Sequence, residues 1–136
     1  MMLKFNRIKP VPKSFLVIEP DISECVLLQD LFTDDYIMVF AHDANEALEV
    51  LAKTPFTVVL FNLGQANKKS LCELKILKTH MRDKPMIIAI TTHNNLEIER
   101  AIAAIGVFYH LLKPYDSKDL TDLVNAAFLG WERRRQ

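Results

Sequence analysis

Glycine is scarce in this sequence, with three among 136 residues. Loops that cradle phosphate groups need closely spaced glycines so that the backbone can approach the ligand. No such cluster is present, which argues against a phosphate loop. Cysteine is scarcer still: Cys25 and Cys72 are the only two, and they lack metal-ligand spacing. This usage predicts a reducing compartment, the cytoplasm, and neither a zinc site nor a disulfide scaffold.

Net charge and long apolar runs are also missing. Seventeen basic and seventeen acidic residues cancel, so nothing global attracts this domain to nucleic acid or to an anionic membrane. No apolar run approaches the length of a membrane span, and the N-terminus lacks the apolar centre of a signal peptide. These absences predict that this domain alone binds no nucleic acid and that it has no membrane partner.

The length of 136 residues suits one domain with a proper core. Residues 1–13, which contain Pro10 and Pro12, are interpreted as an N-terminal extension. Residues 14–130 form the expected domain, and residues 131–136 are the end of the last helix or a linker.

Short apolar runs alternate with helical patterns along the domain. The predicted strands are Phe15–Ile18, Tyr36–Phe40, Thr57–Phe61, Ile87–Ile90 and Phe108–Leu112. Apolar residues at helical spacing lie in two later segments: Ile98, Ala101, Ile102 and Ile105 in one, and Leu120, Leu123, Val124, Ala127 and Trp131 in the other. Strands that are apolar on both faces, alternating with amphipathic helices, predict an α/β fold with a parallel sheet covered on both sides.

Helix starts carry recognisable capping chemistry. Asp21 with Glu24, and Asp43 with Glu46, both fit a capping box, in which the Asp accepts a backbone N–H and the Glu reaches back. Asp116 is expected to cap the last helix.

Polar side chains stand at the C-terminal ends of the predicted strands: Glu19, Asn62, Thr91 and Lys113, with Pro20 and Asp21 directly after Glu19. In an open parallel sheet, ligands bind beyond the carboxyl ends of the strands, where the strand order reverses. The pattern therefore predicts one site at this edge.

The whole arrangement resembles the receiver domain of bacterial two-component response regulators. Its most specific elements are Thr91 and the pair Lys113-Pro114, which are separated by 22 positions and close the fourth and fifth strands. The resemblance covers residues 14–130. It implies a flavodoxin-like, doubly wound, three-layer α/β/α sandwich with five parallel strands in the order 2-1-3-4-5. Right-handed crossovers then put Cys25 and Cys72 on opposite sides of the sheet, so that no disulfide forms between them.

The resemblance also implies roles for the strand-end residues. Position 62 normally holds an aspartate that accepts a phosphoryl group, and positions 19 and 20 hold an acidic pair that binds Mg²⁺ with it. Thr91, His110 and Lys113 match the switch and phosphate-contact positions, His110 standing where an aromatic residue is usual. Here Asn62 lacks the nucleophilic carboxylate, and Pro20 supplies no ligand.

These departures predict a pseudo-receiver: a non-enzymatic module without a cofactor, with Mg²⁺ binding lost or weak, that works through protein contacts. Lys113 is expected to pair with Glu19 and to donate to the Asn62 oxygen. Thr91 is expected to be a strand-end hydroxyl bonded to backbone. His110 is interpreted as a surface or half-buried spacer, and His80 and His93 as surface residues.

The expected partner surface, for self-association or another protein, is the last two helices and the strand between them. Phe128 and Leu129 are either an exposed contact patch or the flank of a linker helix. Two other functions remain open at this point. One is a working phosphoacceptor domain that uses Asp21, and the other is a flavodoxin-like small-molecule binder.

Overall fold

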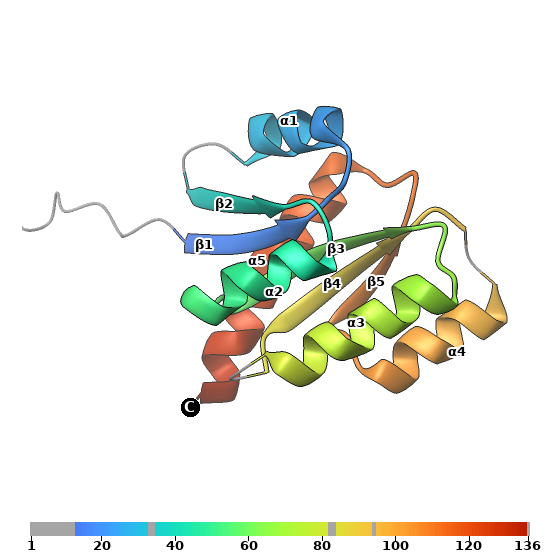
Figure 1. Cartoon of the computed structure of the whole chain (residues 1–136). Coiled ribbons are helices and arrows are strands. Elements are labelled where there is room, and N and C mark those ends of the chain that lie inside the picture. The colour runs from blue at the N-terminus through green and yellow to red at the C-terminus, as the bar shows by residue number, and fades with distance from the viewer. Residues whose placement is uncertain (1–12, 33–34, 82–83, 94, 136) are drawn as a thin grey trace, which may run out of the picture.

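Five strands alternate with five helices in the computed structural model, which describes residues 13–32, 35–81, 84–93 and 95–135 (Figure 1). The strands are β1 (Lys13–Ile18), β2 (Tyr36–Ala41), β3 (Val58–Gly64), β4 (Met86–Thr91) and β5 (Tyr109–Leu112). The helices are α1 (Ile22–Leu31), α2 (Ala44–Lys53), α3 (Lys68–His80), α4 (Leu96–Ile105) and α5 (Ser117–Arg135). Residues 1–12 of the predicted extension lie outside the described residues, whereas Lys13 already belongs to β1. Residues 131–135 are the end of α5.

The strand order is β2-β1-β3-β4-β5, and every neighbouring pair is parallel, which confirms the predicted topology. The order reverses between β1 and β3, so the ends of these two strands flank the expected ligand edge. Strand β3 carries a register shift between Asn62 and Gly64. Gly64 has a φ of +62°, a left-handed conformation that a side chain would strain.

Two apolar layers hold the helices onto the sheet. Ala47, Leu74 and Ile102 place α2, α3 and α4 on one face, in front of the sheet in Figure 1. Leu28 and Val124 place α1 and α5 on the other face. Cys25 of α1 and Cys72 of α3 therefore lie on opposite sides of the sheet, and both are free thiols. The prediction that they form no disulfide is confirmed.

The helix starts differ from their predicted capping in the reciprocal contacts, because neither predicted box is complete: Asp43 accepts the Glu46 N–H, but Glu46 shows no bond back to the Asp43 N–H among the described residues. Asp21, Asp43 and Asp116 all accept a backbone N–H from the first turn of the following helix, as predicted. The predicted reciprocal contact between Glu24 and the Asp21 N–H is also wrong. The Asp21 N–H donates to Glu19 Oε2 at 3.1 Å and not to Glu24. A complete capping box, which the sequence analysis missed, opens α3, where Asn67 and Ser70 bond each other's backbone N–H at 2.9 Å.

Phe128 is a core residue and not part of an exposed patch. It is 6% exposed, and its ring lies 6.3 Å from Phe15 and 5.6 Å from Tyr36. Leu129, one helical position on, is 41% exposed. The helical repeat explains the difference, because Phe128 lies four positions after the buried Val124 and thus on the same face of α5.

Within the described parts of the chain, no helix is both long and apolar enough to cross a membrane.

Candidate functional site

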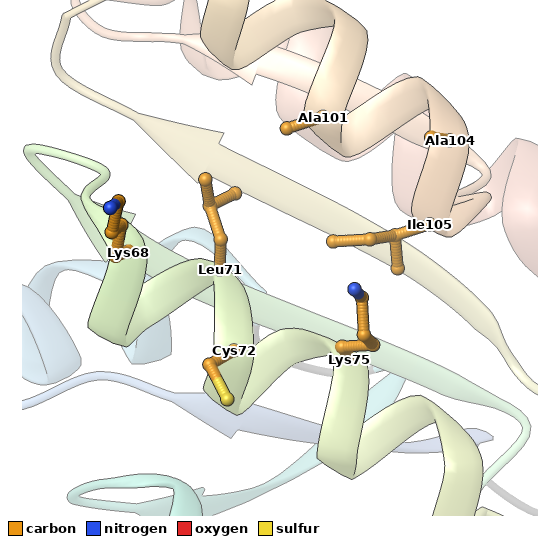
Figure 2. A pocket seen from close by; sticks show the side chains of 7 residues that line it. All are labelled: Lys68, Leu71, Cys72, Lys75, Ala101, Ala104 and Ile105. Carbon is orange, nitrogen blue, oxygen red and sulfur yellow. The ribbon is translucent and has the colours of Figure 1, made fainter.

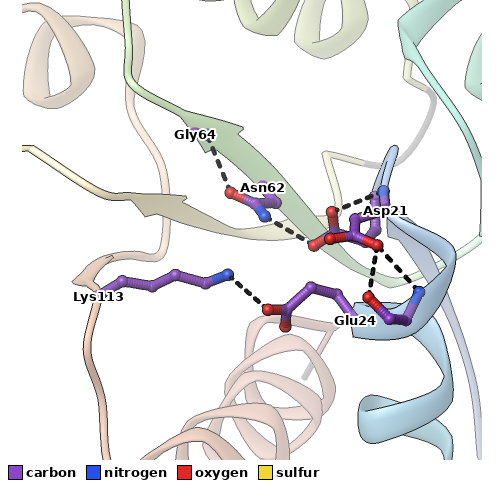
Figure 3. A network of polar contacts seen from close by, with 7 residues as sticks. Asp21, Glu24, Asn62, Gly64 and Lys113 are labelled. Atoms are coloured by element: carbon purple, nitrogen blue, oxygen red, sulfur yellow. Dashed lines mark hydrogen bonds and ion pairs between the residues drawn. The ribbon is translucent and has the colours of Figure 1, made fainter.

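The carboxyl edge of the sheet brings the predicted site residues together. Glu19 directly follows β1, Asn62 lies near the end of β3, Thr91 ends β4 and Lys113 directly follows β5. These positions follow from parallel strands in register, since Thr91 pairs with Gly64 on one side and with Leu112 on the other. Figure 3 shows the polar contacts at this edge.

Glu19 and Asn62 form the centre of the site. Glu19 is 4% exposed, and its Oε1 accepts a hydrogen bond of 2.6 Å from Asn62 Nδ2. Its second oxygen, Oε2, accepts from the Asp21 N–H at 3.1 Å. A buried carboxylate is costly unless donors satisfy it. Here an amide and a backbone N–H provide that satisfaction.

The surrounding groups determine which way the Asn62 amide points. Its Oδ1 accepts the Gly64 N–H at 2.9 Å, across the register shift in β3 (Figure 3). The opposite orientation would place Oδ1 against the Glu19 carboxylate and an NH₂ group against an N–H donor. Position 62 therefore requires a side chain with one donor and one acceptor, which asparagine has and ionised aspartate lacks.

Pro20 and Asp21 link the site to α1. Pro20 is exposed and contributes no side-chain ligand atom. Asp21 is also exposed, and its Oδ1 accepts from the Ser23 hydroxyl at 2.7 Å and from the Ser23 N–H at 2.9 Å. These two hydrogen bonds lower the pKa of Asp21, mainly through the hydroxyl contact. Asp21 is therefore an ionised capping residue at the rim of the site.

Lys113 has a different partner from the one predicted. Its Nζ lies 3.5 Å from Glu24 Oε1, on the first turn of α1, and the expected pairing with Glu19 and Asn62 is wrong (Figure 3). The acceptors expected for Lys113 already have other donors. Asn62 and Asp21 donate to the Glu19 oxygens, and Gly64 donates to the Asn62 oxygen. Both members of the Lys113–Glu24 pair are partly exposed, so the pair contributes little stability.

Thr91 and His110 form a second contact beside the first. Thr91 is 0% exposed, and its Oγ1 lies 2.7 Å from His110 Nε2, with the donor set by the histidine tautomer. The expectation of a backbone partner for Thr91 is thus wrong. His110 is half-buried, one of the two predicted environments. Burial lowers the pKa of its imidazole, and the negative charge of Glu99 offsets only part of this shift. The neutral ring is therefore the favoured form in this contact.

His80 and His93 are surface residues, as predicted. His80 Nδ1 lies 2.8 Å from the Ile76 carbonyl oxygen, and His93 Nδ1 lies 3.3 Å from Thr92 Oγ1. Neither contact connects these rings to the site.

The donor set at the edge does not fit Mg²⁺ well. This ion requires oxygen ligands in near-octahedral geometry, and proteins usually bind it through one or two carboxylates that are free to coordinate it. Glu19 is the single buried carboxylate among the described site residues, and both its oxygens already accept hydrogen bonds. Position 20 has no ligand atom, and the Asn62 oxygen is bonded to Gly64.

Glu24 is the site residue that sequence reasoning missed as a partner of Lys113. Its position did carry a signal, because Glu24 precedes the buried Leu28 by four residues and so shares the inward face of α1. Helix phase combined with the predicted position of Lys113 would have brought the two together.

Comparison with curated proteins finds distant relatives. The chain is 29% identical over 106 residues to the "Transcriptional regulatory protein ZraR" of Escherichia coli strain K12, which covers 77% of this chain. The match spans 24% of the relative's length, so the chain corresponds to about a quarter of that protein. No family model matches the sequence.

Solved structures share the fold. A CheY-like response regulator receiver domain protein from Methanospirillum hungatei JF-1 aligns with a TM-score of 0.79 at 18% identity, over 91% of this chain and 99% of its own. A structure described as adenylate cyclase from Rhodopirellula baltica aligns with a TM-score of 0.80 at 18% identity, over 92% of this chain and 93% of its own. These likenesses confirm the flavodoxin-like, CheY-like receiver fold.

Proposed function

We propose that this chain is a pseudo-receiver module of two-component signal transduction, which acts through protein contacts and is not phosphorylated at position 62. The observation that carries the proposal is the 2.6 Å hydrogen bond from Asn62 Nδ2 to Glu19 Oε1. At the position where a receiver holds its nucleophile, this chain uses a side chain as a donor. The amide has no carboxylate oxygen with which to attack a phosphoryl group.

The comparisons support the signalling context. The relative in Escherichia coli is named a transcriptional regulatory protein, and the Methanospirillum structure is described as a response regulator receiver. The free thiols of Cys25 and Cys72 accord with a reducing cytoplasm.

Internal pairs occupy the side chains that would otherwise meet a metal and a phosphoryl group. Asn62 bonds Glu19, Lys113 pairs with Glu24, and Thr91 contacts His110. Phosphoryl transfer depends on cations that neutralise charge as the nucleophile attacks in line. The proposed module binds Mg²⁺ weakly at most and catalyses no reaction at this edge.

Wild-type protein incubated with acetyl phosphate and Mg²⁺ should keep its mass in intact mass spectrometry. A receiver with an aspartate at the acceptor position, treated in parallel, is the positive control and should gain one phosphate. A phosphate adduct on the wild-type chain would overturn the proposal, and peptide mapping would identify the acceptor.

Asp21 is the alternative acceptor that the structure favours. Its carboxylate is exposed, its pKa is lowered, and it lies at the rim of the site with Lys113 among the charges acting on it. An adduct that maps to Asp21 and disappears in Asp21→Asn would establish this second function. The capping role would survive that substitution, because asparagine caps helices about as well as aspartate does.

We further propose the α4–β5–α5 face as the partner surface. Its exposed apolar side chains come from all three elements and from the residue before β5: Leu96, Tyr109, Leu112 and Leu129, with Phe108. A hollow of about 400 Å³ lies between β5 and α5 and is lined partly by Tyr109 and Leu123. Clustered apolar exposure of this kind is typical of interaction surfaces. Helix α1 also exposes large apolar residues, among them Val26.

Tyr109→Arg is expected to abolish self-association of the chain in sedimentation velocity over a concentration series. The matched control is Val26→Arg, which adds the same charge at a similarly exposed apolar position on α1 and should leave self-association unchanged. Loss of association in the control alone would move the interface to α1. A wild-type chain that stays monomeric throughout would contradict self-association and leave a different protein as the partner.

A further inference from the structure

A groove runs between α3 and α4, on the face of the sheet away from α5 (Figure 2). It has a volume of about 400 Å³. Its lining residues are Lys68, Leu71, Cys72 and Lys75 of α3 with Ala101, Ala104 and Ile105 of α4. In Figure 2 the side chain of Leu71 points across the groove toward Ala101, and the ammonium of Lys75 lies beside Ile105.

The groove arises from small side chains on α4 and from a clamp at one end, which is the side chain of Lys78. Ala101 and Ala104 are too short to fill the space opposite α3. Near the C-terminal ends of both helices, Lys78 Nζ donates to the carbonyl oxygens of Ile105 at 2.6 Å and Gly106 at 2.5 Å. These bonds satisfy orphan carbonyl groups at the end of α4 and hold the two helices together there. The clamp defines one end of the groove.

The charge in the groove is uncompensated. Lys68 and Lys75 are exposed, and neither ammonium group forms an ion pair or hydrogen bond with another residue that the structure describes. They lie seven positions apart on α3, which is two helical turns or roughly 10 Å along the axis. Two positive charges therefore flank an apolar strip formed by Leu71, Ala101 and Ile105.

We propose that the α3–α4 groove docks an acidic amphipathic helix of a partner protein. Apolar side chains on one face of that helix would enter the strip, and carboxylates at positions i and i+7 would pair with Lys68 and Lys75. A helix laid between two packed helices is a common recognition mode, read through side chains that recur every one or two turns. An acyl anion with a single head group would satisfy only one of the two lysines.

This surface is separate from the α4–β5–α5 face and goes beyond the proposed function. It lies on the opposite face of the sheet from the hollow between β5 and α5, and its lining shares no residue with that hollow. The proposal does not depend on whether position 62 is phosphorylated, so the two can fail independently.

The test uses the full chain and a fluorescein-labelled, alanine-based helical peptide. The peptide carries a leucine stripe and glutamates at i and i+7, and fluorescence anisotropy measures binding. The same peptide with lysines in place of the glutamates should bind at least about tenfold more weakly, as expected for the loss of two exposed ion pairs and the gain of two repulsions.

Variants of the chain separate the groove from general charge. Lys68→Glu with Lys75→Glu should weaken binding of the acidic peptide by about tenfold or more. The matched control is Lys53→Glu with Lys69→Glu, which makes the same change of net charge outside the groove and should leave binding within about twofold. Ala104→Trp should block the groove without changing charge, and circular dichroism would verify that each variant is folded.

Three results would overturn the proposal. The acidic peptide fails to bind the wild-type chain, the control pair weakens binding as much as the groove pair does, or Ala104→Trp binds as tightly as wild type. A competition experiment with decanoate tests the other occupant, an acyl anion. If decanoate binds the groove and the acidic peptide does not displace it, the occupant is an acyl anion and the helix is excluded.

Discussion

Asn62→Asp should lower the free energy of unfolding by about 2–4 kcal/mol at neutral pH in metal-free buffer. The substitution replaces the Nδ2 donor, 2.6 Å from Glu19 Oε1, with a carboxylate oxygen. Glu19 is 4% exposed, so solvent screens little of the repulsion. Urea denaturation of the variant and of wild type, both with EDTA, measures the effect.

Asn67→Asp is the matched control for this substitution. Asn67 caps α3 through Oδ1, which accepts the Ser70 N–H at 2.9 Å, and it is exposed. Aspartate caps as well as asparagine and favours the positive end of the helix dipole. The control should therefore be within about 0.5 kcal/mol of wild type.

The pH dependence gives a second signature. Two adjacent carboxylates raise each other's pKa, so in the folded Asn62→Asp variant one of them binds a proton more readily than in the unfolded chain. The unfolded state then binds fewer protons, and stability rises as pH falls. The penalty should be largest at neutral pH and should shrink in mild acid. A penalty that is absent at neutral pH, or unchanged in acid, would contradict the role assigned to the Asn62 donor.

Glu19→Gln should rescue most of the loss in the Asn62→Asp background. The glutamine amide would donate to the aspartate introduced at position 62, while its oxygen accepts the Asp21 N–H. The remaining oxygen of that aspartate would accept the Gly64 N–H. Every polar atom of the pair is then satisfied with the donor and acceptor exchanged. The double-mutant cycle isolates this interaction from unrelated effects of each change.

The fold was predictable because its signals agree with one another. Strands such as Ile87–Ile90 are apolar on both faces, and 0–2% of each of these four residues is exposed, as a sheet covered on both sides requires. The caps at Asp43 and Asp116 depend only on contacts within a few residues, so they too follow from local sequence.

The sequence predicted which residues lie at the site, but not which of them pair with one another. Strand ends determine that Glu19, Asn62 and Lys113 share one edge. Which donor meets which acceptor depends on ångström-scale distances among several candidates, and these follow from the register shift at Gly64 and the phase of α1. Phe128 shows the same limit: hydrophobicity marked it as apolar, but only packing against Phe15 and Tyr36 shows that it is core.

Pro20→Asp together with Asn62→Asp should create a working Mg²⁺ site. Three carboxylates, at positions 19, 20 and 62, would then converge on the edge where the strand order reverses between β1 and β3. Carboxylate oxygens are suitable ligands for Mg²⁺, and the ion would relieve the repulsion that destabilises Asn62→Asp alone. Isothermal titration calorimetry should show Mg²⁺ affinity at least about tenfold above that of wild type.

The matched control for this design is Pro20→Ala with Asn62→Asp. It removes the same proline and adds the same aspartate at position 62, but it supplies no ligand at position 20. Pro20 is exposed, so its loss should cost about 0.5 kcal/mol in either variant through the unfolded chain. Any difference between the two variants then reports the carboxylate at position 20 alone.

Phosphorylation should depend on Mg²⁺ binding at the restored site. With acetyl phosphate and Mg²⁺, the double aspartate variant should gain the mass of one phosphate, whereas Asn62→Asp alone and its alanine partner should gain little. Omission of Mg²⁺ should abolish the adduct, because the metal and Lys113 must neutralise charge during transfer. Lys113 would have to leave Glu24, from which it is 3.5 Å away, and this partly exposed pair is weak enough to permit the exchange. A wild-type chain that gains the phosphate as readily as the double variant would mean that another residue is the acceptor, and the pseudo-receiver proposal would then be wrong.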